Sequence, residues 1–326
     1  MPKRGCFGFS FPLIIGILLV LLVLFVIGFI SGPLGRNMFG DMLPGWLSVP
    51  RPELHLPAET VFHIFGFPIT NSVVAAWLTV IILVGFSFAV TRRLKIIPSR
   101  VQAFLEFALE WLLNFCQRVA GERNGRRFFP VVATIFLFVI INAWLSLLPG
   151  FGSILIINPE GETVHLLRAA NTDINMPLAL AIMSFLFVSY FGLRSLGVSY
   201  LGKFINVRQF ARGLRQLFSG KIVAGFSGVF TGVINMFIGF VEALSQFIRI
   251  ISFTFRLFGN MTAGEILLLM ATFLVPFLFA LPFYGLEILI GFVQALIFGG
   301  LTLIFLTVAV TSHEEGNHHE EEKSEN

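Results

Sequence analysis

Apolar runs dominate this sequence, and several of them reach the roughly 20 residues that a membrane-spanning helix requires. The chain is 56% hydrophobic and only 12% charged, whereas a soluble domain contains about 25% charged residues. The apolar runs do not show the short alternating pattern of outer-membrane β-strands. The sequence therefore predicts an all-α polytopic membrane protein with about six membrane helices.

The apolar runs also define the expected domains. Residues 1–31 form an N-terminal membrane helix or a signal-like segment, and the length of the run favours a retained helix over a signal core. Residues 32–68 are rich in proline and are expected to form an irregular extracytoplasmic connection. Residues 69–312 form the main membrane domain, and residues 313–326 form an acidic cytoplasmic tail.

Within the main domain, spans are expected at about residues 72–90, 128–148, 174–192 and 283–311. Residues 101–122 alternate apolar and charged positions with a helical period, which predicts an amphipathic helix on the membrane surface. Its expected apolar face comprises Val101, Phe104, Leu105, Ala108, Leu112, Phe115 and Val119.

The run from Ile222 to Val275 contains no proline. As one helix it would be about 80 Å long at about 1.5 Å per residue, whereas the hydrocarbon core is about 30 Å thick. The run must therefore either break at a turn between about Glu242 and Asn260 or lie steeply tilted in the bilayer.

Basic residues predict the orientation. Residues 1–10, 91–127 and 194–221 together hold 16 of the 22 Lys and Arg residues, whereas the alternate connections 32–68 and 149–172 hold three. Because basic loops face the cytoplasm, this distribution places the first group of loops there. Nucleic acid is excluded as a partner because the basic residues flank membrane spans and form no basic face.

Arg256 is the most unusual residue, because it lies in the middle of this long apolar run. An arginine at the bilayer centre costs about 3 kcal/mol even on lenient scales, so a partner, a water-filled cavity or a function must compensate. At about 100° per residue, a narrow polar stripe lies within about 40° of Arg256, whereas Glu265 points about 180° away. The stripe comprises Ser252, Asn260, Arg249, Ser245 and Glu242.

Glu287 and Gln294 lie seven residues apart on the last span, and hence on nearly one face. Such residues are either polar contacts between helices, a static ion pair with Arg256, or an ion path. Carboxylates can hold and release protons, whereas arginine essentially never deprotonates. Carboxylates beside a permanent cation therefore suggest a proton path with a barrier.

The separated Cys6 and Cys116 indicate neither a disulfide nor a metal site, and no cofactor is expected.

The segment from Phe240 to Leu268, which contains RLFGN followed by MTAGE, resembles the fifth-helix signature of subunit a of the F-type rotary ATP synthases. Residues 294–298, QALIF, resemble the final helix of that family. Weaker matches are Phe136 to Gly150, with Asn142, and the TDIN string at Thr172. The resemblance covers roughly residues 60–312, and it implies a long, tilted hairpin of helices 5 and 6.

The resemblance implies the following roles. Arg256 would face a ring of c subunits and separate two half-channels. The outward half-channel would involve Glu265, Glu287, Asn260 and Gln294, with Asp173 near its mouth. The cytoplasmic one would be lined by Glu242, Ser245 and Ser252. The implied partners are the c-ring, the b subunits of the peripheral stalk and membrane lipid, and the chain is not an enzyme on its own.

Two features depart from the family. Many relatives have a histidine at the position of Glu265 or Glu287, and the N-terminal helix is additional to the usual five spans. A self-contained proton or sodium transporter is the first alternative, although the chain shows no internal repeat. A membrane-embedded transferase is the second, although no Asp-rich or His-rich cluster is present. Co-purification with a ring-forming subunit distinguishes these possibilities.

Overall fold

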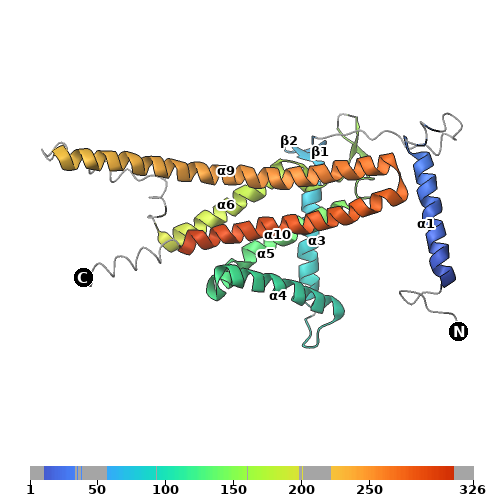
Figure 1. Cartoon of the computed structure of the whole chain (residues 1–326), viewed down its shortest axis with the longest axis horizontal. Coiled ribbons are helices and arrows are strands. Elements are labelled where there is room, and N and C mark those ends of the chain that lie inside the picture. Colours follow the sequence, from blue (N-terminus) through green and yellow to red (C-terminus); the bar gives the residue numbers. More distant parts are fainter. Residues whose placement is uncertain are drawn as a thin grey trace. The chain divides into compact units, whose positions relative to one another are not determined.

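The computed structural model describes residues 11–33, 35, 38, 57–92, 94–159, 161–197, 200 and 222–311 (Figure 1). The predictions for residues 1–10, 201–221 and 313–326, and for most of the proline-rich connection, lie outside the described residues. Most of the described chain is helical, and the 3-10 turns η4 (Ala170–Thr172) and η5 (Phe277–Ala280) join some of the helices. The α-helices are α1 (Phe11–Ser31), α3 (Asn71–Thr91), α4 (Arg100–Ala120), α5 (Glu122–Ser146), α6 (Asn175–Leu196), α9 (Ile222–Leu274) and α10 (Leu281–Thr311).

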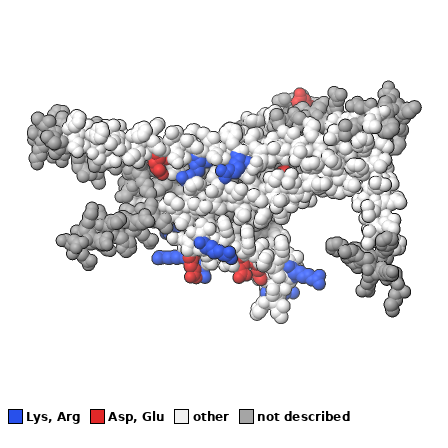
Figure 2. All heavy atoms as spheres, in the orientation of Figure 1, with Lys and Arg blue, Asp and Glu red and all other residues white. Residues whose placement is uncertain are grey.

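Six of the described helices are long and apolar enough to cross a membrane, which confirms the predicted all-α polytopic class. The remaining helix, α4, is the amphipathic one. Ser99 caps its N-terminus by accepting a hydrogen bond from the backbone N–H of Gln102. Gln102, Leu112, Cys116 and Ala120 of this helix are buried, whereas Val101 and Phe104 of the predicted apolar face are exposed and available to lipid. On the face in Figure 2, charged side chains gather around α4 and at a few points along α9.

Two short hairpins were not predicted. Strand β1 (Thr60–Ile64) pairs antiparallel with β2 (Phe67–Thr70), and β3 (Leu155–Ile157) pairs antiparallel with β4 (Thr163–His165). The expectation of an irregular connection up to residue 68 is therefore wrong for this segment. β-branched and aromatic residues favour the strands, and Phe65 and Gly66, with φ of 50° and 84°, form the tight turn that joins β1 to β2.

Helix α9 is continuous over 53 residues. The alternative of a break between Glu242 and Asn260 is therefore wrong. A helix of this length, about 80 Å, exceeds the hydrocarbon thickness of about 30 Å, so it cannot lie along the membrane normal within the bilayer core. Residues 275–280, which include Pro276 and the 3-10 turn η5, form the turn to α10. Helix α5 begins before the predicted residue 128, because the preceding arginines are good helix formers.

The chain forms two compact units. The first comprises Met1–Ala76, Asn142–Asp173 and Gly259–Val293, and the second comprises Trp77–Ile141, Ile174–Phe258 and Gln294–Asn326. Both α9 and α10 contribute to each unit. In the first unit Gly264 lies against Glu287, and in the second the Phe253 ring contacts Phe298 and Phe305. In the second unit the Arg249 guanidinium lies over the Phe305 ring while Phe253 lies closest to Phe298, so the parts of α9 and α10 in that unit run antiparallel.

The second unit contains a hydrophobic core built from α4, α5, α6 and α10. It includes Cys116, Phe128, Val132, Val188, Phe191, Leu303 and Leu306. Phe128 and Phe191 pack edge to face with ring centroids 5.1 Å apart. One buried hydrogen bond of 2.8 Å joins the hydroxyls of Ser184 on α6 and Thr302 on α10.

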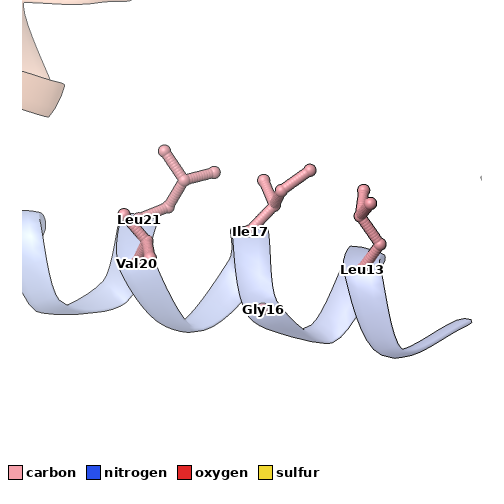
Figure 3. A pocket seen from close by; sticks show the side chains of 5 residues that line it. All are labelled: Leu13, Gly16, Ile17, Val20 and Leu21. Carbon is pink, nitrogen blue, oxygen red and sulfur yellow. The ribbon is translucent and has the colours of Figure 1, made fainter.

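In the first unit, the end of α1 packs closely against the turn between α9 and α10. A Cβ atom added at Gly28 would overlap the carbonyl oxygen of Pro276, and one added at Gly32 would overlap that of Leu274. Small residues four apart allow this approach of helix to backbone, as they do between membrane helices. The rest of α1 exposes apolar side chains, and the shallow hollow in Figure 3 is lined only by its own residues, including Leu13 and Ile17.

Candidate functional site

The predicted site residues divide between the two units. Glu265, Glu287, Asn260 and Asp173 belong to the first unit, and Arg256, Ser252, Ser245, Glu242 and Gln294 belong to the second.

In the second unit, Arg256 is half-buried on α9. Its Nη2 donates a hydrogen bond of 3.4 Å to Ser252 Oγ, one helical turn earlier. Its Cζ atom lies 5.9 Å from the centroid of the Phe253 ring. Within the described part of this unit, no carboxylate forms an ion pair with Arg256. A static ion pair within the unit therefore does not explain this arginine.

Arg249 lies on the same stripe but has a different environment. Its Cζ atom is 3.4 Å from the centroid of the Phe305 ring on α10. Phe253 lies 5.0 Å from Phe298 and 5.9 Å from Phe305, measured between ring centroids. Stacking on an aromatic face stabilises a desolvated guanidinium. This contact gives Arg249 a structural explanation that Arg256 lacks.

The remaining polar residues of the stripe are mostly exposed. Glu242, Ser245 and Ser252 are exposed on α9. Gln246 is buried, and its Nε2 donates a hydrogen bond of 3.3 Å to Glu242 Oε1. Gln294 on α10 is buried. The exposed side of α9 thus presents both Arg256 and several hydroxyl or carboxylate groups along an otherwise apolar helix.

In the first unit, Glu265 has a partner that the sequence did not reveal. Arg168 Nη2 lies 3.5 Å from Glu265 Oε2, and the two side chains are 11% and 36% exposed respectively. Arg168 Nη1 also donates a hydrogen bond of 3.0 Å to the carbonyl oxygen of Pro57. The two residues are 97 positions apart, so helical periodicity cannot relate them. One feature of the sequence could have pointed to Arg168: it is the single Lys or Arg residue of the connection 149–172.

Glu287 lies on α10 and is only 6% exposed. Its carboxylate rests against Gly264, where an added Cβ atom would overlap it. Its Oε2 has no hydrogen-bonding partner among the described residues. Nearby, Trp144 Nε1 donates a hydrogen bond of 3.2 Å to the carbonyl oxygen of Ile288, which packs the end of α5 against α10. Glu287 thus lies beside Gly264, which directly precedes Glu265 on α9.

Asp173 is held in a buried polar network. Ser72 Oγ donates a hydrogen bond of 2.6 Å to Asp173 Oδ2, and the hydroxyls of Thr70 and Ser72 are 2.8 Å apart. The backbone N–H of Asn171 donates a bond of 3.3 Å to Asn142 Oδ1. Buried polar groups of this kind are stable only when they are hydrogen-bonded, so the network joins the start of α3, the end of α5 and η4. Asn260 is exposed on α9.

The described residues contain no group of three or more His, Cys, Asp or Glu that could hold a metal. Cys116 is a free, buried thiol, and burial raises its pKa from 9.0 to about 11, so it stays neutral at physiological pH. Among the predicted site residues, the first unit holds three carboxylates that can bind protons, and the second holds the permanent charge of Arg256 and the carboxylate of Glu242.

Comparison with known proteins identifies similarity over most of the chain. Residues 73–307 match the family model described as ATP synthase A chain. The chain is also 32% identical over 249 residues to the ATP synthase subunit a of Gloeobacter violaceus, an alignment that covers 76% of this chain and 86% of that protein.

Proposed function

The chain belongs to the ATP synthase A chain family, and we propose that it conducts protons to and from the carboxylates of a rotating ring of c subunits. As a family member it is a multi-pass membrane subunit of ATP synthase that takes part in ion transport and ATP synthesis. In the proposed arrangement two half-channels reach the ring from opposite sides of the membrane, and Arg256 separates them. The b subunits of the peripheral stalk hold the chain stationary while the ring turns.

The environment of Arg256 carries this proposal. Its neighbours in the second unit are a hydroxyl and an aromatic ring, neither of which neutralises a positive charge. A charged group in a membrane helix requires compensation by an anion or by water. A carboxylate on a ring subunit supplies that anion, and each passing carboxylate must release its proton to pair with the guanidinium. Because arginine does not deprotonate, it attracts the carboxylate without passing the proton on.

The half-channel open to the outside is proposed to use Glu265, Glu287, Asn260 and Gln294, with Asp173 near its mouth. Support comes from the first unit, where one carboxylate is paired with Arg168 and another is buried beside Gly264. No histidine lies in α9 or α10. Two carboxylates therefore replace the histidine-containing relay of many relatives, as proton-binding groups on facing helices.

The half-channel open to the cytoplasm is proposed to use Glu242, Ser245 and Ser252. Their exposure along one side of α9 supports this role, because hydroxyls and carboxylates can order water along a membrane helix. The bias of basic residues supports the orientation, with the connections 91–127 and 194–221 on the cytoplasmic side.

Substitution of Arg256 tests the proposal directly. We expect Arg256→Ala and Arg256→Lys to abolish proton-driven ATP synthesis in membrane vesicles while the complex still assembles. Lysine keeps a positive charge, but its compact ammonium lacks the planar fork of arginine and can deprotonate. Arg126→Gln is the matched control, because that arginine forms an exposed pair with Glu122, with side chains 67% and 79% exposed. Wild-type synthesis in either Arg256 variant would refute the proposal.

A second experiment tests whether Glu265 and Glu287 act in one path. Glu265→Gln and Glu287→Gln should each slow proton flux through the assembled complex. The double variant should be less impaired than the product of the two single effects, because residues of one path are energetically coupled. Wild-type flux in both single variants would show that these carboxylates are structural.

A further inference from the structure

Arg168 is a largely buried cation that lies beside a proposed proton-path residue of the first unit. It follows strand β4 and precedes η4, outside the membrane helices. One nitrogen of its guanidinium lies 3.5 Å from Glu265 Oε2, and another donates a hydrogen bond of 3.0 Å to Pro57 O. The guanidinium thus connects α9 to the backbone segment that leads into β1.

This ion pair differs from the surface pair that the chain also contains. The Arg168 side chain is 11% exposed, whereas the Arg126 side chain is 67% exposed. An exposed pair contributes little because water screens it and both side chains stay mobile. A buried guanidinium must keep its partners, since loss of either leaves an uncompensated charge or donor. The position of Arg168 therefore depends on the Glu265 carboxylate, and that of the carboxylate depends on Arg168.

The surrounding segment is itself held in place. The backbone N–H of His165 donates a hydrogen bond of 3.2 Å to Glu59 Oε2, and His165 Nδ1 lies 2.6 Å from the carbonyl oxygen of Gly152. The backbone N–H of Leu166 donates a bond of 2.8 Å to Ile154 O. These contacts tie β4 to the neighbouring connections. Arg168 therefore projects from a fixed support toward α9.

We propose that Arg168 is a positioning residue for proton transfer, which holds the Glu265 carboxylate in place at the outward-facing end of the path. This inference rests on the proposed function, because it assigns Glu265 to that path. With Arg168 present, Glu265 is directed toward the β4–η4 connection while Glu287 occupies the space beside Gly264. The two carboxylates thereby keep separate positions on facing helices. Accurate placement of a proton acceptor matters because small displacements slow transfer strongly.

The test uses the complete ATP synthase in membrane vesicles. The rate of ATP-driven proton pumping is measured and divided by the amount of assembled complex. We expect Arg168→Gln to lower the rate roughly tenfold, the scale of losing a charge-assisted hydrogen bond. Arg168→Lys should recover most of the rate, because it restores a charge beside Glu265. Arg126→Gln should match wild type.

A double-variant comparison separates positioning from mere stabilisation of the loop. In a Glu265→Gln background, or Glu265→Asp if the Gln variant has no measurable flux, Arg168→Gln should cause little further loss. An equal loss in both backgrounds would overturn the inference, as would wild-type pumping by Arg168→Gln. If Arg168→Gln does not assemble, Arg168→Lys decides: it should pump close to wild type, and a roughly tenfold loss that is equal in both backgrounds overturns the inference.

The Arg256 variants in the same vesicles keep the two proposals distinct. If they are inactive and Arg168→Gln pumps normally, only the role of Arg168 is refuted. If the Arg256 variants pump normally, the proposed function itself is refuted, whatever the Arg168 variants do.

Discussion

At the scale of single residues, the two arginines of α9 have different environments although both lie on one polar stripe. Arg249 stacks on Phe305 within the hairpin, whereas in the described part of its unit Arg256 lies beside a serine hydroxyl and a more distant ring. Glu265 and Glu287 differ in the same way, since one is paired with Arg168 and the other is buried against a glycine. Sequence position alone would treat the members of each pair as equivalent.

Gly264 provides a prediction at this scale. A methyl group at this position would overlap the Glu287 carboxylate, which lies at the end of a flexible side chain and can move aside. Gly264→Ala should therefore leave the stability of the complex nearly unchanged but lower proton flux roughly tenfold or more, because the carboxylate is displaced. Pumping and thermal stability are measured on the same preparation.

Gly285→Ala is the matched control for this substitution. Gly285 lies on α10 two residues before Glu287, and an added Cβ atom there meets no heavy atom within 4 Å. Equal pumping by the two alanine variants would contradict the importance of the space at Gly264.

At the scale of elements, the packing of α6 on α10 depends on a hydrogen bond in an otherwise apolar core. Thr302 Oγ1 donates a bond of 2.8 Å to the carbonyl oxygen of Phe298 in its own helix. Its hydroxyl proton is thereby used, so the 2.8 Å contact with Ser184 has Ser184 as the donor. Hydrogen bonds between membrane helices are worth about 0.6 kcal/mol on average and at most about 1.7 kcal/mol.

Removal of this hydrogen bond gives the prediction for the elements. Ser184→Ala and Thr302→Val should each destabilise the complex by about 0.6 to 1.7 kcal/mol, and the double variant should lose no more than the larger single effect. Thermal dissociation in detergent measures the change. Additive losses would show that the two hydroxyls act independently. ATP synthesis at moderate temperature should stay close to wild type, because neither residue belongs to the proposed path.

At the scale of the whole molecule, the proposed roles divide between the two compact units, although Gln294, proposed for the outward half-channel, belongs to the second unit. The first unit contains the two hairpins, Arg168, Asp173 and the two carboxylates proposed for the outward half-channel, Glu265 and Glu287. The second contains α4, Arg256 and the residues proposed for the cytoplasmic path. The long helices α9 and α10 contribute to both units. Most residues of the proposed proton path therefore lie on these two helices, and no separate domain forms the channel.

Labelling of introduced cysteines tests the orientation of the chain. In a background with Cys6 and Cys116 replaced, a membrane-impermeant maleimide added outside should label Ser153→Cys but not Asn114→Cys. Both positions are exposed, in the β3 connection and on α4 respectively. In the proposed orientation, the basic residues of segment 91–127 place α4 on the cytoplasmic side. Labelling after permeabilisation controls for reactivity, and outside labelling at position 114 would reverse the assignment of both half-channels.

Much of the fold could be predicted because membrane helices are encoded locally. The spans at 72–90, 174–192 and 283–311 agree closely with α3, α6 and α10, and the amphipathic helix is confirmed as α4. Apolar length and helical period suffice for such predictions, since every backbone group of a spanning helix is satisfied within the helix. The hairpins at residues 60–70 and 155–165 were missed because strands of three to five residues are too short to show a clear alternating pattern, although Asn158, Pro159 and Gly161 mark a turn between β3 and β4.

The sequence by itself determined the class of the protein, its spans and the presence of an unexplained arginine at membrane depth, because these follow from composition and from the period of one helix. Tertiary structure decided which charges have partners. Stacking on Phe305 accounts for Arg249, Arg168 reaches Glu265 across 97 residues, and Gly264 leaves space for the Glu287 carboxylate. These are contacts between side chains of different elements, and no local pattern specifies which elements meet. The physical reason is that helix periodicity orders neighbours within about one turn, whereas burial and charge pairing depend on the packing of the whole chain.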